Sequence, residues 1–247
     1  MNRYFIEVTY RGTNYAGFQK QENAHTVQAE VEAALATVLR SGVQLTGSSR
    51  TDAGVHALQN YFHFDTGLEL KDRLVYNLNA VLPGDLAVNR LVKMPDAAHC
   101  RFDAVGRAYR YHIYRHKQPF LQDRAYFFPY TLDYTRMAEA AALLLDYRDF
   151  TSFSKRNTQV KTFHCTLSES RWEVGDTGCQ YVVRGNRFLR GMVRALTATM
   201  LKVGRGKMSV ADFCGVIEAR DCTLADFAVP AHGLFLEQVE YPDGYFG

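Results

Sequence analysis

Residues 47–57, with the sequence GSSRTDAGVHA, place one carboxylate and one guanidinium among small side chains. Asp52 is the only acid in this segment, and Arg50 lies two positions before it. Small residues such as Ala53 and Gly54 let a backbone come close to a ligand, and loops held by a rigid scaffold often carry catalytic groups. A single aspartate there could act as a nucleophile or in proton transfer. The alternative is a capped turn, in which Asp52 accepts hydrogen bonds from backbone amides.

A second candidate segment, residues 185–194, is rich in arginine. The apolar spacing predicts a helix over residues 188–203. At about 100° per residue, Arg187, Arg190 and Arg194 would share an arc of about 60° if the helix begins early enough. We expect Arg194, which is nearest the apolar boundary, to be partly buried and to need an anionic partner. A solvated basic face explains Arg187 and Arg190 equally well.

Tyr109 and Tyr111 lie two positions apart in the alternating segment 109–114, so they share one face of a predicted strand. Buried core aromatics are the default interpretation of this pattern. Beside a basic surface, the same rings also suit stacking on a nucleobase.

Positive charge is concentrated in two windows, although the formal net charge is only +3. Residues 101–124 contain six basic and two acidic residues, and residues 184–207 contain seven basic residues and no acidic one. Two solvated helices would explain a short basic run. The long segment without a carboxylate favours a polyanionic partner, most simply nucleic acid.

Strands and helices alternate twice along the chain, in a pattern that would position these segments. The first half has predicted strands at 4–10, 61–65 and 86–92 and predicted helices at 26–40 and 70–81. The second half has predicted strands at 109–114, 172–174, 180–184 and 233–241 and helices at 132–145, 188–203 and 209–219. We therefore expect two α+β halves: residues 1–102 with the Asp52 loop, and residues 103–247 with the tyrosine strand and the basic helix.

The composition excludes several classes of protein. The chain has 247 residues, of which 47% are hydrophobic and 22% charged, as in an ordinary globular protein. No uncharged apolar run reaches the roughly 20 residues of a membrane helix, and Glu7 falls where a signal peptide has its apolar region. Five cysteines without a C-x-x-C pair suggest neither a disulfide framework nor a zinc site. We expect a reduced, cytoplasmic protein.

These motifs, in this order, make the sequence resemble the tRNA pseudouridine synthase A family over nearly its whole length. Residues 50–56 (RTDAGVH) look like the family signature, which contains the catalytic aspartate. Residues 10–19 (YRGTNYAGFQ) are similar to the first strand and loop of the family. Further similar blocks are residues 79–85, 101–104 with 109–111, 149–153, 188–194 and 233–242.

The resemblance implies two ferredoxin-like halves that form a mixed, mainly antiparallel sheet with helices on one side and a basic cleft. It also implies a homodimer, without metal or cofactor, that converts uridine to pseudouridine in the anticodon stem-loop of tRNA at positions 38 to 40. Asp52 would be the catalytic aspartate with Arg50 as its neighbour, Tyr109 the tyrosine against the target base, and Arg194 the arginine that pairs with the aspartate. We expect further RNA contacts from Arg187, Arg190, Arg110, Lys155 and Arg156.

Some positions depart from the family pattern without removing a catalytic group. Arg11 and Phe18 replace the usual aspartate and tryptophan of the first loop. Ser48-Ser49 precedes the signature where Ala-Gly is common, and Arg190-Gly191 replaces a frequent His-His pair. These positions lie in predicted loops and helix faces that could touch RNA, so they bear on the choice of substrate more than on the chemistry. The alternative functions are a catalytically silent RNA-binding module, a synthase retargeted to other uridines, and a nucleoside hydrolase, which would want two flanking carboxylates.

Overall fold

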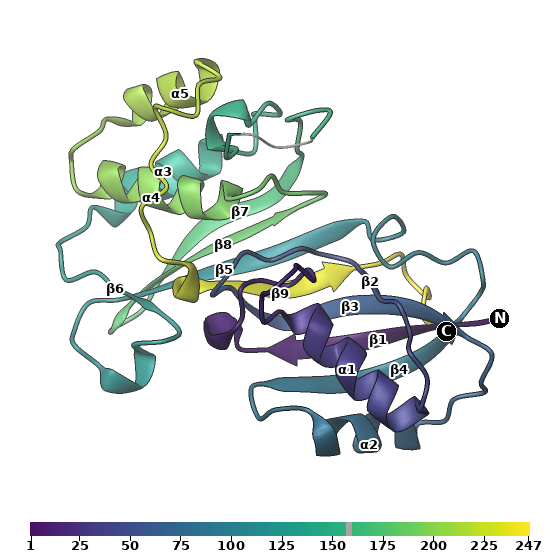
Figure 1. Cartoon of the computed structure of the whole chain (residues 1–247). Coiled ribbons are helices and arrows are strands. Elements are labelled where there is room, and N and C mark those ends of the chain that lie inside the picture. Colours follow the sequence, from purple (N-terminus) through teal and green to yellow (C-terminus); the bar gives the residue numbers. More distant parts are fainter. Residues whose placement is uncertain (157–159) are drawn as a thin grey trace. The chain divides into compact units, whose positions relative to one another are not determined.

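The computed structural model describes residues 1–156 and 160–247, and these residues divide into two compact units. Unit 1 comprises Met1–Val105 and Leu236–Gly247, and unit 2 comprises Gly106–Phe235. Each unit combines strands with helices (Figure 1), so the expected α+β class is confirmed. The sequence pattern alone assigns all of residues 103–247 to the second half, whereas the structure places the last twelve residues in unit 1.

The sheet of unit 1 carries the Asp52 loop. Its strand order is β4-β1-β3-β9, with the short β2 beside β3, and β1 pairs antiparallel with both β3 and β4. The strands are β1 (Asn2–Tyr10), β2 (Thr46–Gly47), β3 (His56–Thr66), β4 (Leu86–Met94) and β9 (Leu234–Glu240), of which the last belongs to unit 1 from Leu236 onward. The helices are α1 (Val27–Leu39), α2 (Arg73–Val81) and the 3-10 turn η1 (Gly12–Asn14).

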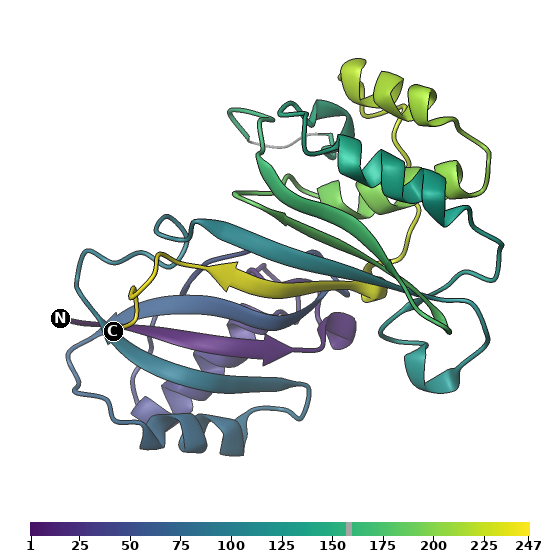
Figure 2. The same cartoon turned by 180° about the vertical axis from the view of Figure 1, so that it is seen from behind.

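Alternation along β1 explains the two faces of this sheet. Tyr4, Ile6 and Val8 are at most 1% exposed and share one face by strand alternation. Ile6 lies opposite Phe62, whose ring stacks on Phe18, and the Phe18 carbonyl accepts from the N–H of Gln28 in the first turn of α1. α1 lies across one face of the sheet (Figures 1 and 2). α1 begins after Thr26, whose side chain accepts a hydrogen bond from the backbone N–H of Ala29. The apolar side of β1 thus fixes where the helix packs.

The opposite face of the sheet explains why the C-terminal segment belongs to unit 1. Phe5, the fully buried residue between Tyr4 and Ile6, contacts the rings of Tyr241, Tyr245 and Phe246 at centroid distances of 6.1–6.2 Å. The hydroxyl of Tyr241 also donates to the backbone carbonyl of Cys100. Burying these rings ties the segment to the first sheet.

Unit 2 has a sheet with the order β5-β8-β7, antiparallel throughout, and a short β6 parallel to β5. Its helices α3, α4 and α5 lie on one face of this sheet (Figure 2). The elements are β5 (Gly106–Tyr114), β6 (Tyr126–Phe127), β7 (Leu167–Val174), β8 (Gly178–Gly185), α3 (Tyr134–Leu143), α4 (Met192–Gly204) and α5 (Val210–Glu218), with 3-10 turns at Pro119–Leu121, Thr151–Phe153 and Ala231–Gly233. Within the described residues, no helix has the length and apolarity needed to cross a membrane.

The start of α4 corrects one expectation. The helix begins at Met192, after Gly191 in a left-handed conformation with φ 77°, and not near residue 188. The preceding segment is held as a loop, because the backbone N–H of Asn186 donates to the carbonyl of Thr166 and its side chain accepts from the N–H of Thr166. Arg187 and Arg190 therefore precede the helix, and the predicted common arc with Arg194 is wrong.

Candidate active site

The loop between β2 and β3 presents Asp52 at the surface of unit 1. Arg50 is exposed, Thr51 is 8% exposed, and Asp52 is half-buried, so the buried threonine lies between two accessible charged groups. The backbone N–H of Val55 donates to the Asp52 carbonyl at 3.2 Å, and Gly54 has a φ of 79°. The turn is thus closed by backbone groups and a glycine in the left-handed region.

The first loop, residues 11–19, packs directly against the Asp52 loop. The N–H of Gly12 donates to Nδ1 of His56 at 3.0 Å, and the N–H of Phe18 donates to the Thr51 carbonyl at 3.1 Å. A Cβ at Gly12 would lie 2.0 Å from the carbonyl oxygen of Val55, and Gly17 has a φ of 114°. Both glycines are therefore required by close backbone approach or by conformation.

Three of the departures from the family pattern are buried, which corrects the expectation that they touch RNA. Phe18 is 1% exposed and stacks on Phe62, with ring centroids 4.4 Å apart and planes 8° from parallel. Ser48 and Ser49 are 3% and 7% exposed. Stacking on Phe62 accounts for Phe18, and hydrogen bonds to Asn60 hold the backbone of Ser49, whereas Arg11 is exposed.

Asp85, the last residue of the 79–85 block, anchors the first loop. Its carboxylate accepts hydrogen bonds from the Tyr15 hydroxyl and from Nδ2 of Asn14, both at 2.7 Å, and its carbonyl accepts from the N–H of Arg11 at 2.9 Å. Burial would raise the pKa of Asp85, but these hydrogen bonds outweigh it and lower the pKa below its ordinary value. The 79–85 block thus supports the Asp52 loop indirectly, through the first loop.

In unit 2, β5 and α4 carry two of the expected site residues, Tyr109 for substrate binding and Arg194 for catalysis. Tyr109 is 8% exposed, and its ring meets Phe188 edge-on at 5.0 Å. Nε and Nη2 of Arg194 donate to the carbonyl of Val229 at 3.0 and 2.6 Å. Burial raises the pKa of the neighbouring Tyr111, and the positive charge of Arg194 acts in the opposite direction. Arg194 is half-buried, as the sequence predicts.

Lys155 and Arg190 are also brought together in unit 2. The N–H of Lys155 donates to the Arg190 carbonyl at 3.0 Å, and the Lys155 side chain lies beside Gly191. The 149–153 block, which precedes Lys155, is itself held by the N–H and hydroxyl of Thr151, which both donate to Oδ1 of Asp149, at 3.0 and 2.6 Å. Of the remaining expected cations, Arg156 is exposed and Arg187 is half-buried.

Arg110 lies on the opposite face of β5 from Tyr109, because neighbouring strand residues point to opposite faces. Its Nη1 is 2.5 Å from a carboxylate oxygen of Glu173 and 2.9 Å from Oε1 of Gln180. Glu173 also pairs with Nη1 of Arg171 at 2.5 Å, so it is shared by two arginines, and an RNA contact by Arg110 would have to compete with Glu173.

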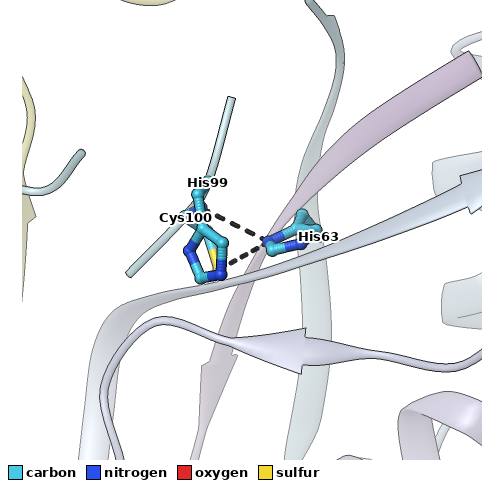
Figure 3. Close-up of side chains that lie close together, drawn as sticks. All are labelled: His63, His99 and Cys100. Carbon is cyan, nitrogen blue, oxygen red and sulfur yellow. Dashed lines mark hydrogen bonds between the residues drawn. The ribbon is translucent and has the colours of Figure 1, made fainter. Parts of the chain in front are cut away.

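His63, His99 and Cys100 have potential metal-ligand atoms that all lie within 4.8 Å of one another in unit 1 (Figure 3). Hydrogen bonds already engage these atoms. Nδ1 of His63 accepts from the N–H of Cys100 at 3.3 Å, the Cys100 thiol donates to the Thr46 carbonyl at 3.2 Å, and Nδ1 of His99 accepts from the N–H of Arg101 at 3.2 Å. Burial lowers the pKa of His63 to about 4. These hydrogen bonds connect β3 to the segment that follows β4, with His63 in its neutral form.

Comparison with known proteins agrees with this distribution of motifs. A sequence model of the family described as tRNA pseudouridine synthase matches residues 6–103 and 140–242. The chain is 46% identical over 250 residues to the tRNA pseudouridine synthase A of Bacteroides thetaiotaomicron, with 100% of this chain and 93% of the relative covered. It is 44% identical over 248 residues to that of Parabacteroides distasonis (100% and 98% covered), and 40% identical over 240 residues to that of Staphylococcus aureus (96% and 90% covered). The chain belongs to the tRNA pseudouridine synthase family.

Proposed function

We propose that the chain isomerises uridine to pseudouridine in tRNA, with Asp52 as the catalytic carboxylate. The observation that carries the proposal is the Asp52 loop: its one carboxylate is half-buried and accessible, and the first loop holds the backbone on both sides of it. Relatives covered over nearly their full length bear the name of this activity. A loop built only to cap a turn would not need such support.

The reaction needs few protein groups. The N1–C1′ bond of the nucleotide breaks, the uracil turns, a C5–C1′ bond forms, the C5 proton leaves, and N1 takes up a proton. The base must first leave the stem, which costs a few kcal/mol. Asp52 serves by adding to the uracil ring or by capturing the sugar while the base turns. Tyr109 lies against the target base in this proposal, Arg194 is the arginine partner of the catalytic carboxylate, and Arg50 is its neighbour in the signature.

Recognition of the RNA rests on the cations of unit 2. Lys155 and Arg190 form the centre of the proposed phosphate contact, with Arg187 and Arg156 beside them in sequence. The proposed target is the anticodon stem-loop at positions 38 to 40, and the proposed working form is a cytoplasmic homodimer. Light scattering of the active enzyme at micromolar concentration tests the dimer, which a fully active monomer would contradict.

The test of the activity is release of tritium from tRNA labelled at C5 of uridine, together with a measurement of free uracil. We expect tritium release without free uracil from the natural chain. Asp52→Asn keeps the size of the side chain but removes the charge, so turnover should fall by about 10³-fold or more, with a stability loss within about 1 to 2 kcal/mol. Free uracil would indicate a hydrolase, and tRNA binding without tritium release would indicate a binding module. Unchanged turnover of Asp52→Asn would refute the catalytic assignment.

A further inference from the structure

A buried polar network lies directly beneath the Asp52 loop. The hydroxyl of Tyr10, at the end of β1, lies 2.8 Å from Oγ1 of Thr51, the residue before Asp52. Nδ2 of Asn60 donates to the same Tyr10 hydroxyl at 3.2 Å. Tyr10 is 4% exposed and Asn60 is fully buried, so neither side chain is accessible to a macromolecular substrate.

Asn60 holds the loop at a second point. Its Nδ2 donates to the Ser49 carbonyl at 2.8 Å, and its Oδ1 accepts from the N–H groups of Ser49 at 3.3 Å and Tyr61 at 2.9 Å. With the bond to Tyr10, the amide uses both donors and both acceptor positions. A buried amide that is fully satisfied in this way fixes one backbone geometry, because any shift of Ser49 leaves a buried polar group without a partner.

The pairing of β1 with β3 is irregular beside Tyr10. The pairing between β1 and β3 shifts register between Val8, which lies opposite Asn60, and Tyr10, which lies opposite Ala57. Two steps along β1 correspond to three along β3, so the extra residue lies in β3, and Tyr10 keeps the face of Val8 by strand alternation. Tyr10, the last residue of β1, thus reaches Thr51.

We propose that Tyr10 and Asn60 are positioning residues for the Asp52 carboxylate, acting through Thr51 and Ser49. This inference rests on the proposed function of Asp52. Thr51 is fixed by its hydroxyl to Tyr10 and by its carbonyl to the N–H of Phe18, so the backbone that enters Asp52 has little freedom. A displacement of about 1 Å at a reacting group can lower a rate by about 10²-fold. Loss of the network should therefore lower turnover and leave tRNA binding unchanged.

The main variant is Tyr10→Phe, which removes one hydroxyl and keeps the ring. We expect kcat for tritium release to fall by about 10-fold while the Kd for tRNA stays within about twofold. Thr51→Val, which removes the partner hydroxyl, should lower kcat to a similar extent, and the double variant should be no worse than either single one. Thr51→Ser keeps a hydroxyl at this position and should restore most of the turnover.

The matched control is Tyr61→Phe. Tyr61 is 3% exposed in the neighbouring strand, and its hydroxyl donates to Oε2 of Glu7 at 2.6 Å on the opposite face of the sheet. This variant also loses a buried tyrosine hydrogen bond, so it should melt earlier as Tyr10→Phe does, but its kcat should be unchanged. Equal loss of kcat in both variants, additive effects of Tyr10→Phe and Thr51→Val, or failure of Thr51→Ser to restore turnover would overturn the positioning role. Absence of tritium release from the natural chain would instead overturn the proposed function.

Discussion

Gly12→Ala is the substitution that tests most directly how the first loop supports Asp52. The added Cβ would lie 2.0 Å from the carbonyl oxygen of Val55, and the carbon of that carbonyl is at 2.6 Å. Both are backbone atoms, so no side-chain rotation relieves the overlap. A carbon and an oxygen need more than 3 Å between them, so the two loops must separate by about 1 Å.

This separation should affect both stability and rate. Overpacking of this kind costs about 1 to 3 kcal/mol of unfolding free energy, and the 3.0 Å bond from the Gly12 N–H to His56 lengthens with it. Val55 also closes the turn at Asp52 through its own N–H. We therefore expect turnover to fall by up to about 10²-fold, since a shift of about 1 Å at a reacting group has that effect.

The assay is tritium release under saturating tRNA, with a denaturant melt of the same preparation. Gly42→Ala is the control, because a Cβ there has no atom within 4 Å; its stability should change by less than about 0.5 kcal/mol. Turnover of Gly12→Ala at the natural rate, or no difference from Gly42→Ala in stability and rate, would contradict the role of the first loop in supporting Asp52.

Three further outcomes are expected. Folding lowers the pKa of His63 from 6.5 to about 4, so between these pH values the unfolded chain binds a proton that the folded chain does not. The free energy of unfolding should therefore fall by up to about 3 kcal/mol as the pH drops from about 6.5 to 4. Denaturant melts of His63→Gln at both pH values should show that most of this pH dependence is lost. Arg190→Gln should reduce the magnitude of the slope of log K for tRNA binding against log[salt] by about one. Arg110→Gln should leave this slope unchanged, because Arg110 is already paired with Glu173. Equal slopes for the two variants would contradict this prediction. Tyr109→Phe keeps the ring beside Phe188, so a binding titration should give a tRNA affinity within a few-fold of that of the natural chain. If the hydroxyl carries the C5 proton, turnover falls by about 10² to 10⁴. Unchanged turnover would show that the Tyr109 hydroxyl has no part in the reaction and that the residue acts only in packing.

The apolar periodicity of the sequence and its cap and turn residues are sufficient to predict most elements of the fold. β1, α1, α2 and β5 lie within a few residues of their predicted ranges, because their apolar alternation and their caps are encoded locally. The start of α4 was not predicted, because it depends on tertiary contacts. Asn186 pairs with Thr166, twenty positions earlier, and Gly191 adopts a left-handed conformation that the helical pattern does not reveal.

The candidate site likewise contains some residues that the sequence predicts and others that only the structure reveals. Asp52 and its loop could be found from the sequence, because one carboxylate among small residues is a local signal. Asn60 could not be found, because nothing distinguishes a hydrogen-bonded amide inside a strand from an exposed one until Ser49 and Tyr10 are seen to contact it. Arg110 shows the opposite error: its charge is visible in the sequence, but its compensation by Glu173 requires the register of three strands.

The two units carry different parts of the proposed activity, and this separates the effects of substitutions. In unit 1, Gly12 and Tyr10 contact the Asp52 loop directly, and Asp85 holds the first loop that packs against it, so changes there should alter turnover more than binding. In unit 2, Lys155 and Arg190 lie near the surface in a loop fixed by backbone bonds, so changes there should alter the salt dependence of binding more than turnover. The departures from the family pattern then fall into two groups. The buried Phe18 belongs to the support of the Asp52 loop, whereas Arg11 and Arg190 are exposed, so we expect substitutions at these two positions to affect RNA binding rather than the loop.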